Sequence, residues 1–246
     1  MVRGYDVSKL QGTVDWTKEK ARGIAFSYLA CTVGNDSVDS FFGMNATATK
    51  NAGVLRGPYH FCYPLPAKAG VANRDPKSQM ELFFSKCAGL GANEGDLPPM
   101  LDAEWPQQAD YDKWGCSNEQ IRDWLLAAVD AATGLFGVKP VLYTYPYWWA
   151  EILTAGGCDD FAQYPVSFAD YEVAPGAWPA DGASPPKLAA PWAPSWTFWQ
   201  TTGGKGANRV TLTNGCPVDT EVFNGTMDDL LALTRRGAPG GAVPNV

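Results

Sequence analysis

Residues 97–105 read Leu-Pro-Pro-Met-Leu-Asp-Ala-Glu-Trp, and this stretch decides both the fold and the candidate site. Met100 and Leu101 form the apolar part of a short predicted strand, and Asp102 and Glu104 lie at its end. Side chains alternate along a strand, so residues two positions apart share a face. Two carboxylates held close raise the pKa of one of them, as acid–base catalysis requires. A strand-end pair bound to Lys or Arg has the same sequence pattern.

The composition excludes several classes of protein. The chain has 246 residues, 46% of them hydrophobic and 18% charged, which suffices for a sizeable core. A net charge of −7 argues against nucleic-acid binding, which needs a basic face. No apolar run reaches the roughly 18 residues of a membrane span, and the N-terminus leads into a predicted strand without a signal peptide. We therefore expect neither a nucleic-acid partner nor a membrane partner.

Cysteine and histidine are poorly placed for metal or triad chemistry. The six cysteines are scattered without a Cys-x-x-Cys pair, and His60 is the one histidine. Neither a zinc site nor a Ser-His-Asp triad is expected, and the sequence predicts no metal and no organic cofactor. Cys158 and Cys216 lie in predicted loops, and the sequence leaves open whether they form a disulfide.

Aromatic residues are unusually frequent, at 13% of the chain. Several tryptophans fall at predicted strand ends or in loops, among them Trp105, Trp148, Trp149, Trp196 and Trp199. Sugar rings present flat C–H faces that stack on aromatic rings, so an acidic, Trp-rich and His-poor chain favours a carbohydrate substrate. An aromatic core explains any single tryptophan equally well.

Predicted strands alternate with predicted helices along the chain. The strands lie near residues 4–7, 24–32, 57–63, 97–105, 141–145, 165–171, 196–200 and 218–222. The pattern predicts an α/β fold, an irregular and flattened TIM-like β/α barrel of about eight strands, because the helices of the second half are weak. Ser117 and Gln120 predict a capping box at one helix start. We expect one catalytic barrel domain over residues 1–237 and a flexible Gly/Pro-rich tail over residues 238–246.

Polar residues gather at the predicted ends of these strands, where β/α barrels place their active sites. Buried carboxylates are costly unless they are used or paired, so a barrel that is only a core has no reason to collect them. The residues at these ends are Asp6, His60, Asp102, Glu104, Tyr143, Asp170, Gln200 and Asp219.

Five short motifs follow one another from Tyr5 to about Gly225. They are Tyr5-Asp6-Val7-Ser8 with Gln11-Gly12 and Asp15-Trp16, Gly57-Pro58-Tyr59-His60-Phe61, Leu97–Glu104, Phe198-Trp199-Gln200, and Val218-Asp219. In this order they resemble the motifs of the glycoside hydrolase family 25 lysozymes, the Chalaropsis-type muramidases. Each motif alone is weak, but five in the right order over one domain are specific.

The resemblance implies hydrolysis of the β-1,4 bond between N-acetylmuramic acid and N-acetylglucosamine. Glu104 would be the general acid/base, and Asp102 would orient the substrate's acetamido group, which attacks the anomeric carbon. Carboxylates at alternate positions of one strand are awkward as a nucleophile and acid astride the sugar, which favours this substrate assistance. Substrate-binding or site-tuning roles are implied for Asp6, Asp219, His60, Tyr143, Gln200, Tyr59, Trp105 and Tyr171.

The chain departs from the family at two strands. The second strand often ends Lys-Ala-Thr-Glu-Gly, but residues 30–34 lack both charges, with Ala30 and Val33 in their places. Affinity or specificity is expected to differ if the missing glutamate matters. The sixth strand carries Asp170 at a variable position, where it either enters the site or forms a surface salt bridge. His60 also fits a core histidine with satisfied hydrogen bonds, and Asp219 also fits a cap or turn.

The leading hypothesis is a muramidase that acts on bacterial cell-wall glycan strands, on the extracellular side, as a monomeric catalytic domain. The missing signal sequence suits a phage-encoded lysin, made in the cytoplasm and released with a holin or delivered on the phage particle. A secreted enzyme after processing is the alternative. A second hypothesis is a wall-binding or virion structural module that kept the fold and lost catalysis. A third is a chitinase-like hydrolase, but the longer acidic run typical of that class is missing.

Overall fold

The structure, a computed structural model of the 246-residue chain, describes residues 1–64, 75–105, 115–153, 157–171, 178–185, 187–204 and 209–235. The tail expected over residues 238–246 lies outside these ranges.

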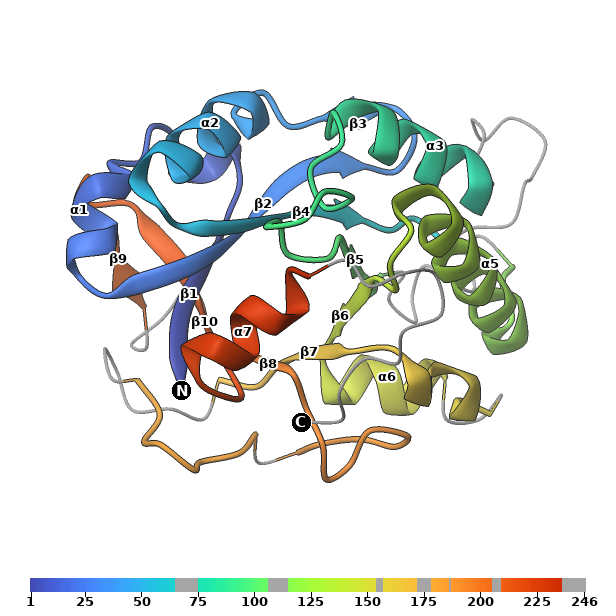
Figure 1. Ribbon diagram of the computed structural model, residues 1–246. Helices are drawn as coiled ribbons and strands as arrows, with labels where there is room; N and C mark the ends of the chain where they lie inside the picture. Colours follow the sequence, from blue (N-terminus) through green and yellow to red (C-terminus); the bar gives the residue numbers. More distant parts are fainter. Residues whose placement is uncertain are drawn as a thin grey trace.

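Eight strands of the described chain close into a barrel, as the alternating pattern predicts (Figure 1). They are β1 (Val2–Val7), β2 (Ile24–Val33), β4 (Leu55–Phe61), β5 (Met100–Asp102), β6 (Val141–Thr144), β7 (Val166–Ala169), β8 (Phe198–Gly203) and β10 (Pro217–Phe223). The pairing of β1 with β2 closes the ring. Strand β10 is antiparallel to both β1 and β8, whereas the other neighbouring barrel strands run parallel. Outside the barrel, the two-residue strands β3 (Ser37–Val38) and β9 (Val210–Thr211) pair antiparallel with β2 and β10, respectively.

Helices cover the barrel unevenly. They are α1 (Trp16–Ala21), α2 (Phe42–Ala52), α3 (Pro76–Lys86), α5 (Asn118–Phe136), α6 (Pro146–Ile152) and α7 (Met227–Leu233), with short 3-10 helices at Lys9–Gln11 and Asp159–Gln163. Ser117 and Gln120 form the predicted capping box at the start of α5. In the described chain no helix connects β7 to β8 or β8 to β10, and orange loop segments cover that side in Figure 1. The expected irregularity of the second half is therefore confirmed.

Aromatic rings fill the barrel interior near the starts of the parallel strands. The ring of Phe198 lies 5.3 Å from those of Phe26 and Phe223, centroid to centroid. Gly4 on β1 faces this cluster, and a Cβ atom there would lie 2.4 Å from the Phe26 ring. Helix α7 crosses the same end of the barrel and adds Leu230 to the cluster (Figure 1). This end is therefore closed by packing, and the open mouth lies at the other end.

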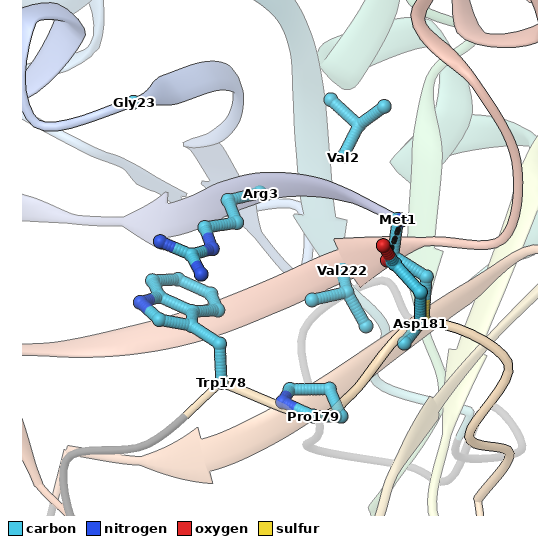
Figure 2. Close-up of a pocket in the computed structure, with 8 residues that line it drawn as sticks. All are labelled: Met1, Val2, Arg3, Gly23, Trp178, Pro179, Asp181 and Val222. Atoms are coloured by element: carbon cyan, nitrogen blue, oxygen red, sulfur yellow. Dashed lines mark hydrogen bonds and ion pairs between the residues drawn. The ribbon is translucent and has the colours of Figure 1, made fainter.

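The loop after β7 is attached to the start of β1 (Figure 2). The Arg3 guanidinium lies 5.1 Å from the centroid of the Trp178 ring, which also stacks on Tyr5 at 6.3 Å. The amino group of Met1 pairs with Asp181. Figure 2 shows Met1, Arg3, Trp178 and Asp181 around a pocket of about 450 Å³. These contacts fix the loop to the barrel on the side that no helix of the described residues covers.

All six cysteines are free thiols, so Cys158 and Cys216 do not form the disulfide that the sequence leaves open. None of the helices in the described ranges is long and apolar enough to cross a membrane.

Candidate active site

The barrel mouth brings four of the predicted acids together. Asp6 lies near the end of β1, Asp102 is the last residue of β5, and Glu104 follows two residues later. Asp219 pairs with Asp6 in the register of β10 against β1. It lies near the start of its strand, not at the carboxyl end that we expected. It still reaches the mouth because β10 runs antiparallel to its neighbours.

A hydrogen-bond network joins four of the predicted site residues. The amide Nε2 of Gln200 donates to Oδ2 of Asp6 at 2.7 Å. The hydroxyls of Tyr143 and Tyr171 donate to Oε1 of the same amide, at 2.8 Å and 2.7 Å. An ionised Asp6 can only accept, so the amide nitrogen faces the acid and the amide oxygen faces the two phenols, which can donate. Strands β1, β6 and β8 are thus connected through their side chains at the mouth.

Burial and like charges raise the proton affinity of the acids. Asp102 is 9% exposed, and burial raises its pKa well above the ordinary value, with further contributions from the charges of Glu104, Asp6 and Asp219. Burial also raises the pKa of Asp6 to about 6, against the opposing effect of the hydrogen bond from Gln200. Asp102 and Asp6 therefore keep their protons to a higher pH than solvent-exposed aspartates do.

Two tyrosines face this acidic cluster and stay neutral. Burial raises the pKa of Tyr59 well above its ordinary value, and the negative charges of Asp6 and Asp102 raise it further. Burial also raises the pKa of Tyr143, which feels the charges of Glu104 and Asp102. Both phenols remain hydrogen-bond donors over the whole physiological pH range.

A cleft of about 380 Å³ opens beside Glu104. Tyr145, Tyr147, Asp170 and Tyr171 line it, with Tyr147 74% exposed and Tyr171 45% exposed. Asp170 is only 8% exposed and lines this cleft, so its position fits the first of the two alternatives, in which it enters the site. Acids and accessible aromatic rings at one cleft are the combination that a sugar polymer needs.

His60 and Trp105 have other surroundings. His60 is 0% exposed, and its two ring nitrogens lie 2.8 Å from Thr32 Oγ1 and 3.0 Å from Gln79 Oε1. Burial lowers its pKa to about 4, so it stays neutral. This position fits the core histidine of the alternative interpretation. Trp105 is half-buried, and its ring centroid lies 4.5 Å from that of Tyr63.

Glu221 is an acid that the sequence analysis did not select. It is 0% exposed on β10, and Ser167 Oγ donates to its Oε1 at 3.1 Å. Burial raises its pKa well above the ordinary value, and the charges of Asp6 and Asp219 add to the effect. Glu221 lies two residues after Asp219, the same spacing that selected Asp102 and Glu104. The alternation rule applied to this strand could therefore have found it.

The described residues contain no group of three or more His, Cys, Asp or Glu side chains arranged to hold a metal ion. The reactive groups of the mouth are carboxyls, phenols and one amide. Such a set can donate and accept protons and can hydrogen-bond to sugar hydroxyl and acetamido groups.

Comparison with known proteins identifies the family. A family model described as Glycosyl hydrolases family 25 matches residues 5–208. Lysozyme M1 of Streptomyces globisporus is 32% identical over 238 residues, which cover 96% of this chain and 72% of that protein. An N,O-diacetylmuramidase of Arthroderma benhamiae is 29% identical over 237 residues, covering 96% of this chain and 88% of that protein. The solved muramidase from Trichobolus zukalii has a TM-score of 0.76 at 28% identity, covering 97% of this chain and 100% of that one. The chain belongs to family 25 of the glycosyl hydrolases, and it is a glycoside hydrolase.

Proposed function

We propose that this enzyme is a muramidase that cleaves the β-1,4 bond between N-acetylmuramic acid and N-acetylglucosamine in cell-wall peptidoglycan. The observation that carries the proposal is the pair of acids at the end of β5, with Asp6 and Asp219 close enough for their charges to act on Asp102. The cleft with its exposed tyrosines opens beside Glu104. The names of the related proteins, a lysozyme and an N,O-diacetylmuramidase, support a muramidase activity.

In the proposed reaction Glu104 protonates the leaving glycosidic oxygen while the acetamido oxygen of the substrate attacks the anomeric carbon. The acetamido N–H donates to Asp102, which favours the ionised form of this acid and leaves the proton of the pair on Glu104. A water molecule then attacks the anomeric carbon, opens the ring formed by the acetamido group, and gives its proton to Glu104. Each turnover thus returns Glu104 to its starting protonation state.

The remaining site residues have supporting roles in this proposal. Gln200 and the two phenols that donate to it hold Asp6 in place. Asp6 and Asp219 raise the proton affinity of Asp102 through their negative charges. Tyr59 stays neutral and faces the same acids, so its hydroxyl is available to a substrate oxygen.

The test is digestion of purified peptidoglycan, followed by borohydride reduction of the new ends and mass spectrometry. Reduced muramic acid is the expected product. Reduced glucosamine would instead mean a glucosaminidase, and anhydro-muramic products a transglycosylase. No new ends on several wall types would favour a wall-binding module without catalysis.

Substitution of the acid completes the test. Glu104→Gln should remove nearly all activity while the fold and glycan binding remain, because the amide cannot protonate the leaving oxygen. Glu94→Gln, an exposed glutamate outside the mouth, is the matched control and should keep full activity. An active Glu104→Gln variant would show that the acid is assigned to the wrong residue.

A further inference from the structure

The cleft beside Glu104 has one basic side chain among the described residues that line it, and this is Lys187. It comes from the loop that follows β7, on the side of the barrel that no described helix covers. Its side chain is exposed, and Tyr147 and Tyr171, both exposed, line the same cleft. A cation, two aromatic rings and the general acid therefore border one opening.

The charges around Lys187 make its position unusual. Asp6, Asp102, Glu104 and Asp219 form an acidic mouth, and Asp170 adds a further acid to the lining of the cleft. The proposed substrate is itself anionic, because each muramic acid residue bears a lactyl carboxyl group that is either free or joined to a stem peptide with its own carboxylates. The acidic mouth repels such a glycan. A cation at the edge of the mouth is therefore the place where a substrate carboxylate gains the most electrostatic attraction.

We propose that Lys187 recognises a carboxylate of the muramic acid substituent and so makes the cleft selective for muramyl glycans over neutral glycans. The inference rests on the proposed function. A lysine suits this role because its ammonium has three donors and sits on a flexible four-carbon stem, which can follow a mobile substituent. The tyrosines of the cleft would contact the sugar rings, while Lys187 binds the side group. Lys187 is then a specificity residue and takes no part in bond cleavage.

The experiment compares three soluble glycans. The first carries intact stem peptides. The second has been treated with an amidase, which removes the peptides and leaves free lactyl carboxylates. The third has its carboxylates converted to neutral amides with carbodiimide and ammonia. Values of kcat and KM are measured for the wild type, Lys187→Gln and Lys187→Glu. Lys50→Gln, an exposed lysine outside the cleft, is the matched control.

Lys187→Gln should raise KM about three- to tenfold on the first glycan without changing kcat, as expected for loss of an exposed charge pair. Lys187→Glu should raise KM further. On the amidated glycan all four proteins should have the same KM. On the second glycan a persisting effect identifies the lactyl carboxylate as the ligand, and a lost effect identifies the stem peptide.

Two results would overturn the inference. One is an unchanged KM of Lys187→Gln on the first glycan, and the other is an equal rise in KM on the amidated glycan. Binding of the same glycans to the Glu104→Gln protein, with and without Lys187→Gln, gives the same comparison without turnover. A wild type that binds these glycans but releases no reduced muramic acid would refute the proposed function alone. Equal binding of the intact and the amidated glycans would refute the role of Lys187 alone.

Discussion

At the scale of single residues, Asp102 is a buried acid with an oxygen atom that the described residues leave unsatisfied. Its Oδ1 atom is buried and has no hydrogen-bond partner among the described residues, and burial together with three neighbouring acids raises its pKa. A buried polar atom of this kind is costly for the fold unless a ligand uses it. The acetamido N–H of the substrate is the donor that the proposed mechanism supplies.

Asp102→Asn should therefore lower kcat about a hundredfold or more and change KM much less. The amide keeps the shape of the side chain but cannot take the negative charge that stabilises the attacking acetamido group in the transition state. Steady-state kinetics on soluble glycan measure both constants, and circular dichroism checks the fold. A loss below about tenfold would show that Asp102 does not face the reacting acetamido group.

Asp6 links the site to stability. Its pKa is about 6 in the folded chain against an ordinary value of 3.8, mainly because of burial. Between these two pH values the folded chain binds a proton that the unfolded chain has released. The free energy of unfolding therefore falls as pH rises through this window, by on the order of 2 kcal/mol.

Asp6→Asn removes this dependence, because an amide does not ionise. The difference in stability between the variant and the wild type should therefore favour the variant more at pH 7 than at pH 4.5. Urea midpoints of both proteins at the two pH values measure this difference. Asp228→Asn, at an exposed aspartate in α7, is the control and should show no such difference. If the stability of Asp6→Asn differs from that of the wild type by the same amount at both pH values, the raised pKa of Asp6 is contradicted.

Residue spacing selects acids that the structure brings together at the mouth, but it does not reveal their hydrogen-bond partners. The two-residue alternation selects Asp102 and Glu104, and applied to β10 it also selects Glu221, which is buried beneath the same mouth. Sequence does not reveal that Gln200 donates to Asp6, because these residues lie 194 positions apart. Sequence also does not distinguish a core histidine from a substrate-binding histidine, because the hydrogen-bond partners of His60 lie on β2 and α3, far from it in the chain.

At the scale of elements, most strand positions were predicted to within about three residues, but the strand expected at 97–105 is only β5 (Met100–Asp102), and strand direction was not predicted. The expected strand at 218–222 is β10 (Pro217–Phe223), yet it runs antiparallel to β1 and β8. A strand has the same side-chain alternation in both directions, so the pattern alone cannot tell them apart. The difference matters because it places Asp219 at the mouth from the start of its strand.

Helix α7 is the element that closes the opposite end, and its packing can be tested directly. Leu230 is 0% exposed and packs in the aromatic cluster with Phe26, Phe198 and Phe223. Leu230→Ala should lower the free energy of unfolding by about 2–5 kcal/mol, because it leaves a cavity in a close-packed interior. Met227→Ala, on the exposed first turn of α7, should cost much less.

Urea denaturation of the two α7 variants gives both values. Activity at low temperature should stay close to that of the wild type in each, since the mouth lies at the other end of the barrel. Equal losses of stability would show that α7 does not seal the interior. A large loss of activity in folded Leu230→Ala would show that the two ends of the barrel are coupled.

At the scale of the whole molecule, net charge sets how the enzyme meets its substrate. The chain has a formal charge of −7, and the proposed glycan substrate carries carboxylates, so the two repel each other at long range. Raising ionic strength from about 10 mM to about 150 mM shortens the Debye length from about 30 Å to about 8 Å and screens this repulsion. The value of kcat/KM on the intact glycan should therefore rise several-fold over this range.

The amidated glycan should show little change in kcat/KM with salt, because it has no charge to screen. Lys187→Gln should steepen the rise, since removing the local cation leaves only repulsion. If kcat/KM of the wild type instead falls with salt, the attraction at the cleft outweighs the repulsion from the rest of the molecule.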